Sequence, residues 1–350
     1  MFYTGPYDLV ALVSAPLTAF VVSLLGGAWL IRFFRRRRVF EDTSQPDHAG
    51  LNEVQTRKKN VPTMGGLAIV AGIVVGALLW GDPRSPHLWL GLGCVVLFAG
   101  LGLADDLIKR RGRRARGLTK KEKLIVQFVL GGLLGGALLM LQRRGEAWFD
   151  CRVLLPFVRE PLDLGLWYIL WTAFIVTAAS NAVNLTDGLD GLAGGCTVIA
   201  ALALALVGIL GVRNVLLAET LRLGASSGTI LALALLGATL GFLRFNVHPA
   251  RIFMGDTGSL MIGGLLATIA LLLKIEVLFF LIGAVFFVNE LTVALQIASY
   301  KLTRRRIFPI TPIHHYFQLN LKWPEQKIAV RAWIVGALAG VASLLATRLF

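Results

Sequence analysis

Residues 124–142 read LIVQFVLGGLLGGALLMLQ, a run with no charged side chain. A helix needs roughly 20 apolar residues to cross the hydrocarbon core of a bilayer, so this run is long enough. The whole chain of 350 residues is 56% hydrophobic and 16% charged, whereas about a quarter of a soluble domain is charged. Ten apolar segments of this kind occur, at about 8–34, 63–81, 87–107, 124–142, 164–184, 191–211, 226–246, 258–273, 276–300 and 328–348. The sequence therefore predicts an all-α integral membrane protein with ten transmembrane helices.

Residues 1–350 are interpreted as one polytopic membrane domain, because no separate soluble part or internal repeat stands out. The first segment is too long for a cleaved signal peptide, and its arginines follow it instead of preceding it. The three cysteines form no disulfide framework. Function is therefore expected in the longer loops between the segments.

The net charge of +15 would suit a nucleic-acid-binding protein, but its distribution argues against that. With the N-terminus outside and ten crossings, the loops at 35–62, 108–123, 185–190, 244–257 and 301–327 lie on the cytoplasmic side. They hold 24 of the 35 Lys and Arg residues. This is the asymmetry of the positive-inside rule, so both termini are predicted to be periplasmic.

Carboxylates gather at segment ends on the predicted cytoplasmic side. Asp105 and Asp106 end the third segment, Asp187 and Asp190 follow the fifth, and Asp256 opens the eighth. Acids near the hydrocarbon core are costly, so they mark functional sites by default. The alternative for the adjacent pair is a solvated helix end, with Lys109 or the arginines beyond it offsetting the repulsion. Five converging acids predict one site for a cation or a polyphosphate–metal complex.

The stretch 181–191, Asn-Ala-Val-Asn-Leu-Thr-Asp-Gly-Leu-Asp-Gly, places two amides before two acids. Asn181 and Asn184 are neighbours on a helix, whereas Gly188 and Gly191 break the helical pattern. We therefore expect Asn181 and Asn184 near a helix end and the two acids in the loop. Such groups suit sugar hydroxyls, a uracil edge or metal-bound water, and simple capping is the alternative.

Residues 245–259 form a polar hairpin between apolar segments, with Asp256 predicted at a helix N-terminus. Mg²⁺ is usually held by one or two carboxylates together with substrate phosphates. Asp256 is the first candidate for its protein ligand, and a plain helix cap is the alternative.

Basic residues and histidines supply the counterpart for an anionic substrate. Lys58 precedes the turn Pro-Thr-Met-Gly-Gly at 62–66, and Lys121 and Lys123 precede the fourth segment. Lysines bind phosphates, although most loop lysines only set topology. His314 and His315 lie in the last long loop without a further His or Cys, so phosphate contact is a better interpretation than zinc.

Five motifs occur in order: Pro-Thr-Met-Gly-Gly (62–66), Asp-Asp (105–106), the 181–191 stretch, the 245–259 hairpin and Pro-Ile-His-His (312–315). Together they resemble the phospho-N-acetylmuramoyl-pentapeptide transferases, a family of the polyprenyl-phosphate N-acetylhexosamine-1-phosphate transferase superfamily. The similarity runs from about residue 55 to about residue 335. The acidic pair and Asn-x-x-Asn-x-x-Asp occur throughout the superfamily, and the other three motifs point to this family.

The resemblance implies ten transmembrane helices with periplasmic termini, a homodimer and a place in the bacterial inner (cytoplasmic) membrane. It implies Mg²⁺-dependent transfer of phospho-MurNAc-pentapeptide from UDP-MurNAc-pentapeptide to undecaprenyl phosphate, giving lipid I and UMP. This reaction belongs to peptidoglycan synthesis and so to cell-wall biogenesis, cell shape and cell division. No nucleic-acid partner is implied.

The resemblance also assigns site residues by their position in the motifs. Asp256 matches the Mg²⁺ ligand, and Asp105 and Asp106 match the catalytic acidic pair, either of which acts as a base or as a nucleophile. Residues matching the surroundings of the nucleoside and metal are Lys58, Asn184, Asp187, Asp190 and Phe253; those matching the phosphate-handling side are Lys109, Lys121, Lys123, His314 and His315. Thr63 and Asn181 lie in the same motifs and are further candidates for substrate binding.

The chain departs from the family pattern Pro-x-His-His-His-Phe-Glu, since Tyr316 replaces the third His and Gln318 the acid. Three alternatives to the transferase remain, of which a structural membrane scaffold would leave the five converging acids unexplained. A sister enzyme using UDP-GlcNAc is disfavoured by the His-His loop and by Pro-Thr-Met-Gly-Gly. An ion-coupled transporter is disfavoured because the acids gather at one membrane face and no inverted repeat is present.

Overall fold

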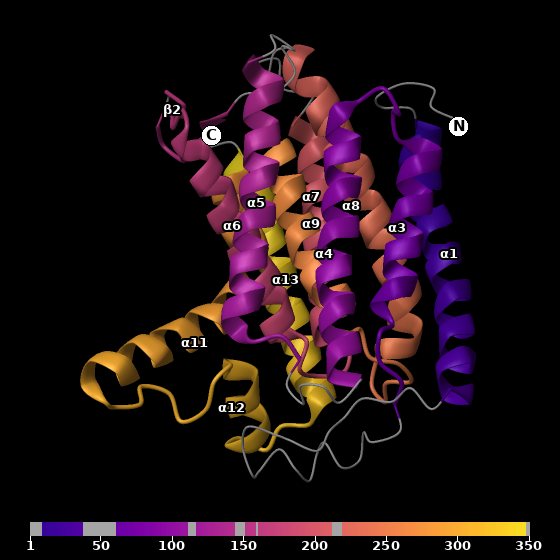
Figure 1. The fold of residues 1–350 in the computed structure, drawn as a ribbon, viewed down its shortest axis with the longest axis vertical. Coiled ribbons are helices and arrows are strands. Elements are labelled where there is room, and N and C mark those ends of the chain that lie inside the picture. The colour runs from indigo at the N-terminus through magenta and orange to yellow at the C-terminus, as the bar shows by residue number, and fades with distance from the viewer. Residues whose placement is uncertain are drawn as a thin grey trace.

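The computed structural model describes residues 9–37, 61–110, 117–143, 151–158, 160–211 and 219–347, with the side chains of residues 211 and 219–225 excluded. Most of its helices lie side by side in one bundle (Figure 1). They are α1 (Leu9–Arg36), α3 (Gly66–Trp80), α4 (Pro86–Arg110), α5 (Lys120–Arg143), α6 (Trp167–Thr186), α7 (Leu192–Gly211), α8 (Glu219–Asn246), α9 (Gly255–Leu272) and α13 (Glu325–Ala346).

Every predicted apolar segment is helical, which confirms a multi-pass membrane protein. Among the described residues, eight helices are long and apolar enough to cross a membrane, and a bent pair would make a ninth. The eighth predicted segment, the shortest in sequence, is the 18-residue helix α9. The short helix is instead α3, whose 15 residues extend only about 22 Å at 1.5 Å per residue.

The ninth predicted segment, 276–300, is two helices instead of one. α10 (Glu276–Ile282) and α11 (Ala284–Thr303) meet at 89° around Gly283. Gly283 closes α10 by donating its N–H to the carbonyl of Phe279, 2.8 Å away. Figure 1 shows α11 projecting sideways from the bundle, with the short helix α12 (Ile313–Leu319) beneath it. Hydropathy alone did not reveal the bend, because both sides of the break are apolar.

The protein also contains a small antiparallel ribbon, so the all-α prediction was incomplete. β1 (Arg152–Val153) pairs with β2 (Leu162–Asp163), with Arg152 opposite Asp163. Strands of two residues are too short to produce an alternating sequence pattern.

Helix α9 forms the centre of the bundle, and α4, α6 and α8 pack around it. Every side chain from Thr257 to Leu272 is buried. Close approach to α9 depends on glycine at Gly102 of α4: a Cβ atom there would overlap the backbone of Asp256. Small residues at helix contacts are usual in membranes, where helices associate through close packing.

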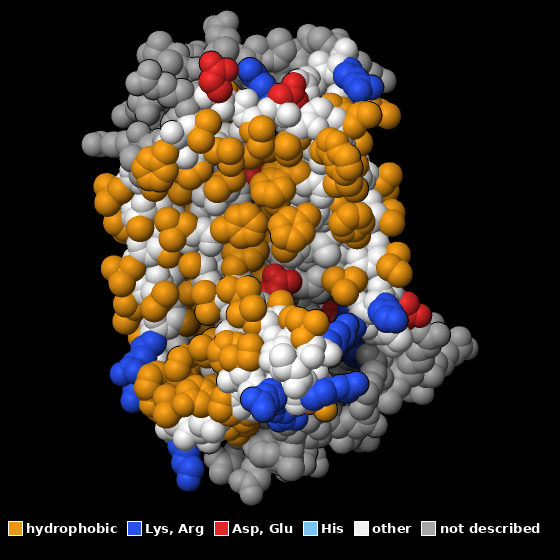
Figure 2. All heavy atoms as spheres, turned by 90° about the vertical axis from the view of Figure 1, so that its left-hand side faces the viewer, with side chains coloured by type: hydrophobic (Ala, Val, Ile, Leu, Met, Phe, Trp, Pro, Cys, Tyr) orange, Lys and Arg blue, Asp and Glu red, His pale blue; other side chains and the backbone are white. Residues whose placement is uncertain are grey.

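The outer helices carry the surface expected for contact with lipid. Of the 18 most apolar consecutive residues, 22% are buried in α1 and 28% in α13, against 89% in both α8 and α9. Figure 2 shows hydrophobic side chains as a broad band over one face, with Lys and Arg gathered mainly beyond its lower edge.

Both ends of the described chain lie at the same end of the bundle. In Figure 1, α1 begins at the upper right and α13 ends at the upper left, near β2. The end of α4, the start of α5, the end of α6 and the start of α9 all lie at the opposite end. That second end collects most of the predicted site residues.

Candidate active site

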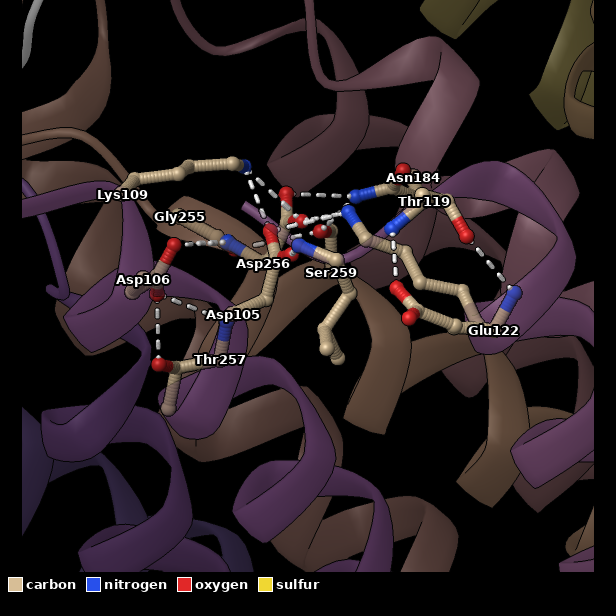
Figure 3. A network of polar contacts seen from close by, with 12 residues as sticks. Asp105, Asp106, Lys109, Thr119, Glu122, Asn184, Gly255, Asp256, Thr257 and Ser259 are labelled. Atoms are coloured by element: carbon tan, nitrogen blue, oxygen red, sulfur yellow. Dashed lines mark hydrogen bonds and ion pairs between the residues drawn. The ribbon is translucent and has the colours of Figure 1, made fainter. Parts of the chain in front are cut away.

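Four helix ends bring polar side chains together inside the lower part of the bundle (Figure 3). Asp105 and Asp106 come from the end of α4, and Asp256 comes from the first turn of α9. One oxygen of each of these carboxylates lies within 4.8 Å of the others. Lys123 of α5 and Asn184 of α6 complete the cluster. The sequence could indicate each residue, but only the packing of four helices makes them neighbours.

Asp106 caps the N-terminus of α9. Its Oδ1 accepts the N–H of Asp256 at 3.2 Å, and its Oδ2 accepts the N–H of Thr257 at 3.0 Å and its hydroxyl at 2.6 Å. The first N–H groups of a helix have no partner within it, and a carboxylate is favourable there. A cap was weighed as the alternative for Asp256, but in the structure Asp106 fills that position.

Asp105 is buried and faces two ammonium groups. Its Oδ2 lies 2.6 Å from Nζ of Lys109 and 2.9 Å from Nζ of Lys123, and its Oδ1 accepts the N–H of Leu118 at 2.6 Å. The repulsion between adjacent acids is therefore offset by Lys109, one of the two alternatives given, together with Lys123 and the α9 N-terminus.

Asp256 shares the same lysines and presents its other oxygen to an amide. Its Oδ2 pairs with Lys123 and lies 3.1 Å from Nζ of Lys109. Its Oδ1 accepts the Nδ2–H of Asn184 at 2.9 Å, and that amide also donates to Ser259 at 2.8 Å. Asn184 therefore orients Asp256 across the gap between α6 and α9.

Lys123 is positioned by a capping box at the start of α5. The N–H of Thr119 donates to Oε2 of Glu122 at 2.7 Å, and the N–H of Glu122 donates to the Thr119 hydroxyl at 3.2 Å. This reciprocal pattern fixes where a helix begins. The signal, Thr followed three residues later by Glu before an apolar run, was readable in the sequence and was missed.

The turn at 62–66 pairs with the polar hairpin. The N–H of Phe253 donates to the carbonyl of Pro62 at 2.8 Å, and the N–H of Gly65 donates to the carbonyl of Phe253 at 2.8 Å. Gly255 has a positive φ of 75°, which glycine adopts without strain. A Cβ on Gly255 would lie 3.1 Å from the hydroxyl of Thr63, so Thr63 lies close to the start of α9.

The structure does not bring all five predicted acids into one cluster. Asp187 follows the end of α6 as its C-cap, in the loop as expected. Asp190 belongs to a second group with His248 and Glu325. Its Oδ2 accepts the N–H of Ala250 at 3.0 Å and lies 3.0 Å from Nδ1 of His248. Asp190 therefore anchors the hairpin to the loop, a contact that the spacing of the acids did not reveal.

Three other candidates lie away from the acidic cluster or outside the described residues. Asn181 donates to Oε1 of Gln127 at 3.0 Å and so joins α6 to α5. Lys121 is exposed near the start of α5. Lys58 lies outside the described residues.

His314 and His315 lie on α12, beside the loop that follows α6. Their ring centroids are 4.2 Å apart. Nδ1 of His314 lies 2.9 Å from Oδ1 of Asn289 on α11. Burial, with a smaller contribution from His315, lowers the pKa of His314 well below its usual range. Asn289, inside the ninth apolar segment, therefore joins α11 to α12 by a hydrogen bond.

The donors of the acidic cluster fit Mg²⁺. Mg²⁺ prefers oxygen ligands, and the three carboxylates offer oxygens only. Lys109 and Lys123 pair with Asp105 and Asp256, so a cation held by these carboxylates would share them with the two lysines. Asp256, 15% exposed, is more accessible than the fully buried Asp105, so it is the better placed ligand.

The bundle and its carboxylate–lysine centre define the class of this protein, a multi-pass membrane protein with a charged site at one end of the bundle. Residues 88–274, more than half of the chain, match glycosyl transferase family 4. The chain is 40% identical to the phospho-N-acetylmuramoyl-pentapeptide-transferase of Chloroherpeton thalassium, over 96% of this chain and 92% of the relative. The enzymes of that name from Rhodopseudomonas palustris and Chlorobaculum parvum are each 38% identical, over 94% and 96% of this chain and 92% of each relative.

The chain therefore belongs to the phospho-N-acetylmuramoyl-pentapeptide transferase family, within glycosyl transferase family 4. This confirms the resemblance inferred from the five motifs, and with it a transferase function in peptidoglycan synthesis.

Proposed function

We propose that this chain transfers phospho-MurNAc-pentapeptide from UDP-MurNAc-pentapeptide to undecaprenyl phosphate, releasing UMP and forming lipid I. The observation that carries the proposal is the gathering of Asp105, Asp256, Lys109 and Lys123 at one end of the bundle. Phosphoryl transfer depends mainly on positioning and charge neutralisation, which such a centre supplies.

We propose Mg²⁺ as the cofactor, with Asp256 as its protein ligand. When bound, Mg²⁺ would neutralise the donor pyrophosphate and favour departure of UMP. Asn184 holds the Asp256 side chain, Ser259 accepts a hydrogen bond from the same Asn184 amide, and Asp106 holds the helix turn that carries Asp256. These contacts support a positioning role for Asp106, and its direct participation in the chemistry stays a prediction.

We propose that Lys109 and Lys123 exchange their carboxylate partners for substrate phosphates when the donor binds. Their side chains are 37% and 17% exposed, so both can be reached from outside the cluster. Phosphate oxygens would replace carboxylate oxygens as acceptors, because lysine ammonium groups bind either. Asp105, released from its lysines, would then orient or deprotonate the acceptor phosphate.

We propose ten crossings, with α3 and the bent pair α10–α11 added to the eight longer helices, and a site facing the cytoplasm. The basic loops and the common position of the two chain ends support this orientation. The three native cysteines are buried, so single cysteines can report accessibility in the inner membrane of intact cells. A membrane-impermeant maleimide should label Arg84→Cys and spare Lys120→Cys; the reverse pattern would overturn the orientation.

The deciding experiment measures UMP release by the purified protein with undecaprenyl phosphate and Mg²⁺. UDP-MurNAc-pentapeptide and UDP-GlcNAc are offered separately, with Asp256→Ala and, as a matched control, Asp163→Ala in the exposed strand β2. We expect turnover of the muramoyl donor alone. Asp256→Ala should abolish this turnover, whereas Asp163→Ala should keep it. Turnover should also return when Mg²⁺ is restored to the chelated enzyme. Turnover of UDP-GlcNAc would overturn the substrate, and turnover in chelator would overturn the metal.

We also propose the homodimer implied by the family resemblance. Light scattering of the detergent-solubilised protein tests it: a protein mass of one chain across the working concentration range would refute it.

A further inference from the structure

Two amide side chains decide which nitrogen carries the proton in each histidine of α12. Nδ2 of Asn289 donates to the carbonyl of Val285 at 2.9 Å, and a carbonyl can only accept. Oδ1 of Asn289 must then be the atom that faces Nδ1 of His314, at 2.9 Å. An amide oxygen also only accepts, so the hydrogen of that bond is on Nδ1.

The same logic holds for His315. Nε2 of Gln318 donates to Oε1 of Glu325 at 3.3 Å, because a carboxylate oxygen accepts the amide hydrogen. Oε1 of Gln318 therefore faces Nδ1 of His315, at 3.1 Å, and Nδ1 carries the hydrogen. Glu325 opens α13, where a negative charge is favourable, so the amide is held from a fixed helix end.

Both rings then turn Nε2 toward the loop between α6 and α7. A Cβ atom on Gly188 would lie 2.8 Å from Nε2 of His314 and 3.5 Å from Nε2 of His315. Nε2 of His314 is buried and has no hydrogen-bond partner in the described part of the chain. A neutral imidazole protonated on Nδ1 leaves Nε2 as an acceptor, and burial favours the neutral ring.

We propose that Asn289 and Gln318 are positioning residues, which keep the protons of His314 and His315 on Nδ1 so that these rings meet the donor substrate through acceptor Nε2 atoms. The inference rests on the proposed function and specifies the chemistry of that site. The groups recognised are hydroxyl or N–H groups of the nucleotide sugar. A phosphate oxygen, the contact that the sequence had predicted, would instead need an Nε2 that carries a hydrogen and donates it.

The charged groups around the two rings are few among the described residues. Glu325 of α13 reaches His315 through Gln318, and Asp190 and His248 lie on the far side of Glu325. Asp187 lies in the loop beside Gly188. An amide at position 318, where the family pattern has an acid, therefore puts a neutral group directly on the ring.

The test exchanges this amide and follows kcat/KM of the donor from about pH 5.5 to pH 9, a range that spans imidazole titration. In Gln318→Glu, a carboxylate accepts the same Nδ1 hydrogen and raises the pKa of the ring. The acid limb of the profile should therefore move to higher pH by about 1 unit or more. Gln318→Met, of similar volume and without an acceptor, should lower kcat/KM at all pH values and leave the limb unshifted.

Wild-type turnover in the same assay establishes the proposed function separately. If Gln318→Glu gains activity at neutral and alkaline pH, the rings donate to phosphate and the inference is overturned. An unchanged profile in both variants would overturn it as well. The ¹⁵N spectra of histidine-labelled protein, assigned with His314→Gln, give an answer that needs no turnover: bare Nε2 on His314 is expected, and protonated Nε2 would refute the proposal.

Discussion

Gly102 lies where α4 meets the start of α9, and its replacement by alanine is expected to displace the candidate metal ligand. The added Cβ would overlap the carbonyl oxygen and carbon of Asp256 and the nitrogen of Thr257, all backbone atoms that no rotamer change can move. Carbon atoms in contact lie about 3.5–4.0 Å apart, so the two helices must separate by roughly 1 Å at this point.

The expected cost follows from that shift. Overpacking a well-filled contact destabilises by about 1–3 kcal/mol. A displacement of about 1 Å in a reacting group can cost on the order of 100-fold in rate. Gly102→Ala is therefore expected to lower kcat about 100-fold while the protein still folds in the membrane.

Gly100→Ala is the matched control, since the same helix carries it and a Cβ there meets no atom within 4 Å. UMP release in the transferase assay and the midpoint of thermal unfolding in detergent are measured for both variants. Activity of Gly102→Ala within threefold of Gly100→Ala would show that α9 tolerates the displacement, and would refute the proposed dependence of Asp256 on this contact.

Three further predictions concern the helix ends and the histidine pair. Asp106→Asn keeps the shape of the α9 cap but removes its charge and turns an amide donor toward an N–H group. The free energy of unfolding should therefore fall by about 1–2 kcal/mol. An unchanged midpoint of thermal unfolding would contradict a capping role for Asp106. Thr119→Ala should cost about 1 kcal/mol and raise the KM for the donor through Lys123, whereas Thr119→Ser should behave as wild type. Because the pKa of His314 is lowered on folding, the unfolded chain takes up the proton more readily, so stability present above about pH 6.5 should be lost as the pH falls below it. Thermal midpoints between about pH 7.5 and 5.5 should therefore fall more steeply in wild type than in His314→Gln, and equal slopes would contradict a neutral buried ring.

Much of the fold was predictable because a bilayer imposes simple requirements on sequence. All ten apolar segments are helical, the ninth as two helices, since a chain in hydrocarbon must satisfy its backbone groups internally. The bend at Gly283 and the ribbon of β1 and β2 were not predictable. Hydropathy does not distinguish a straight apolar helix from two helices in succession. Strands of two residues each are too short to show the alternation of apolar and polar residues that marks a strand.

The candidate site was predicted in its residue types and only partly in its arrangement. The prediction of Asp105, Asp106 and Asp256 as neighbours is confirmed. The sequence did not show that Asp106 caps α9 while Asp105 faces the lysines. Two adjacent acids cannot be told apart in sequence, because the difference depends on which one contacts the N–H groups of another helix. Asp190, similar in sequence context to Asp187, lies instead with His248 and Glu325.

The sequence by itself determined that this is a membrane protein, its family and most of the polar residues of the candidate site, because these depend on composition and on short motifs. Only the tertiary structure decided which residues share a site and which atom of each is presented. Contacts such as that between Asn289 and His314 join residues far apart in the chain, and their geometry is set by helix packing instead of by spacing. The residue type fixes which groups a side chain offers, whereas the fold fixes its hydrogen-bond partners and, through them, where its proton lies.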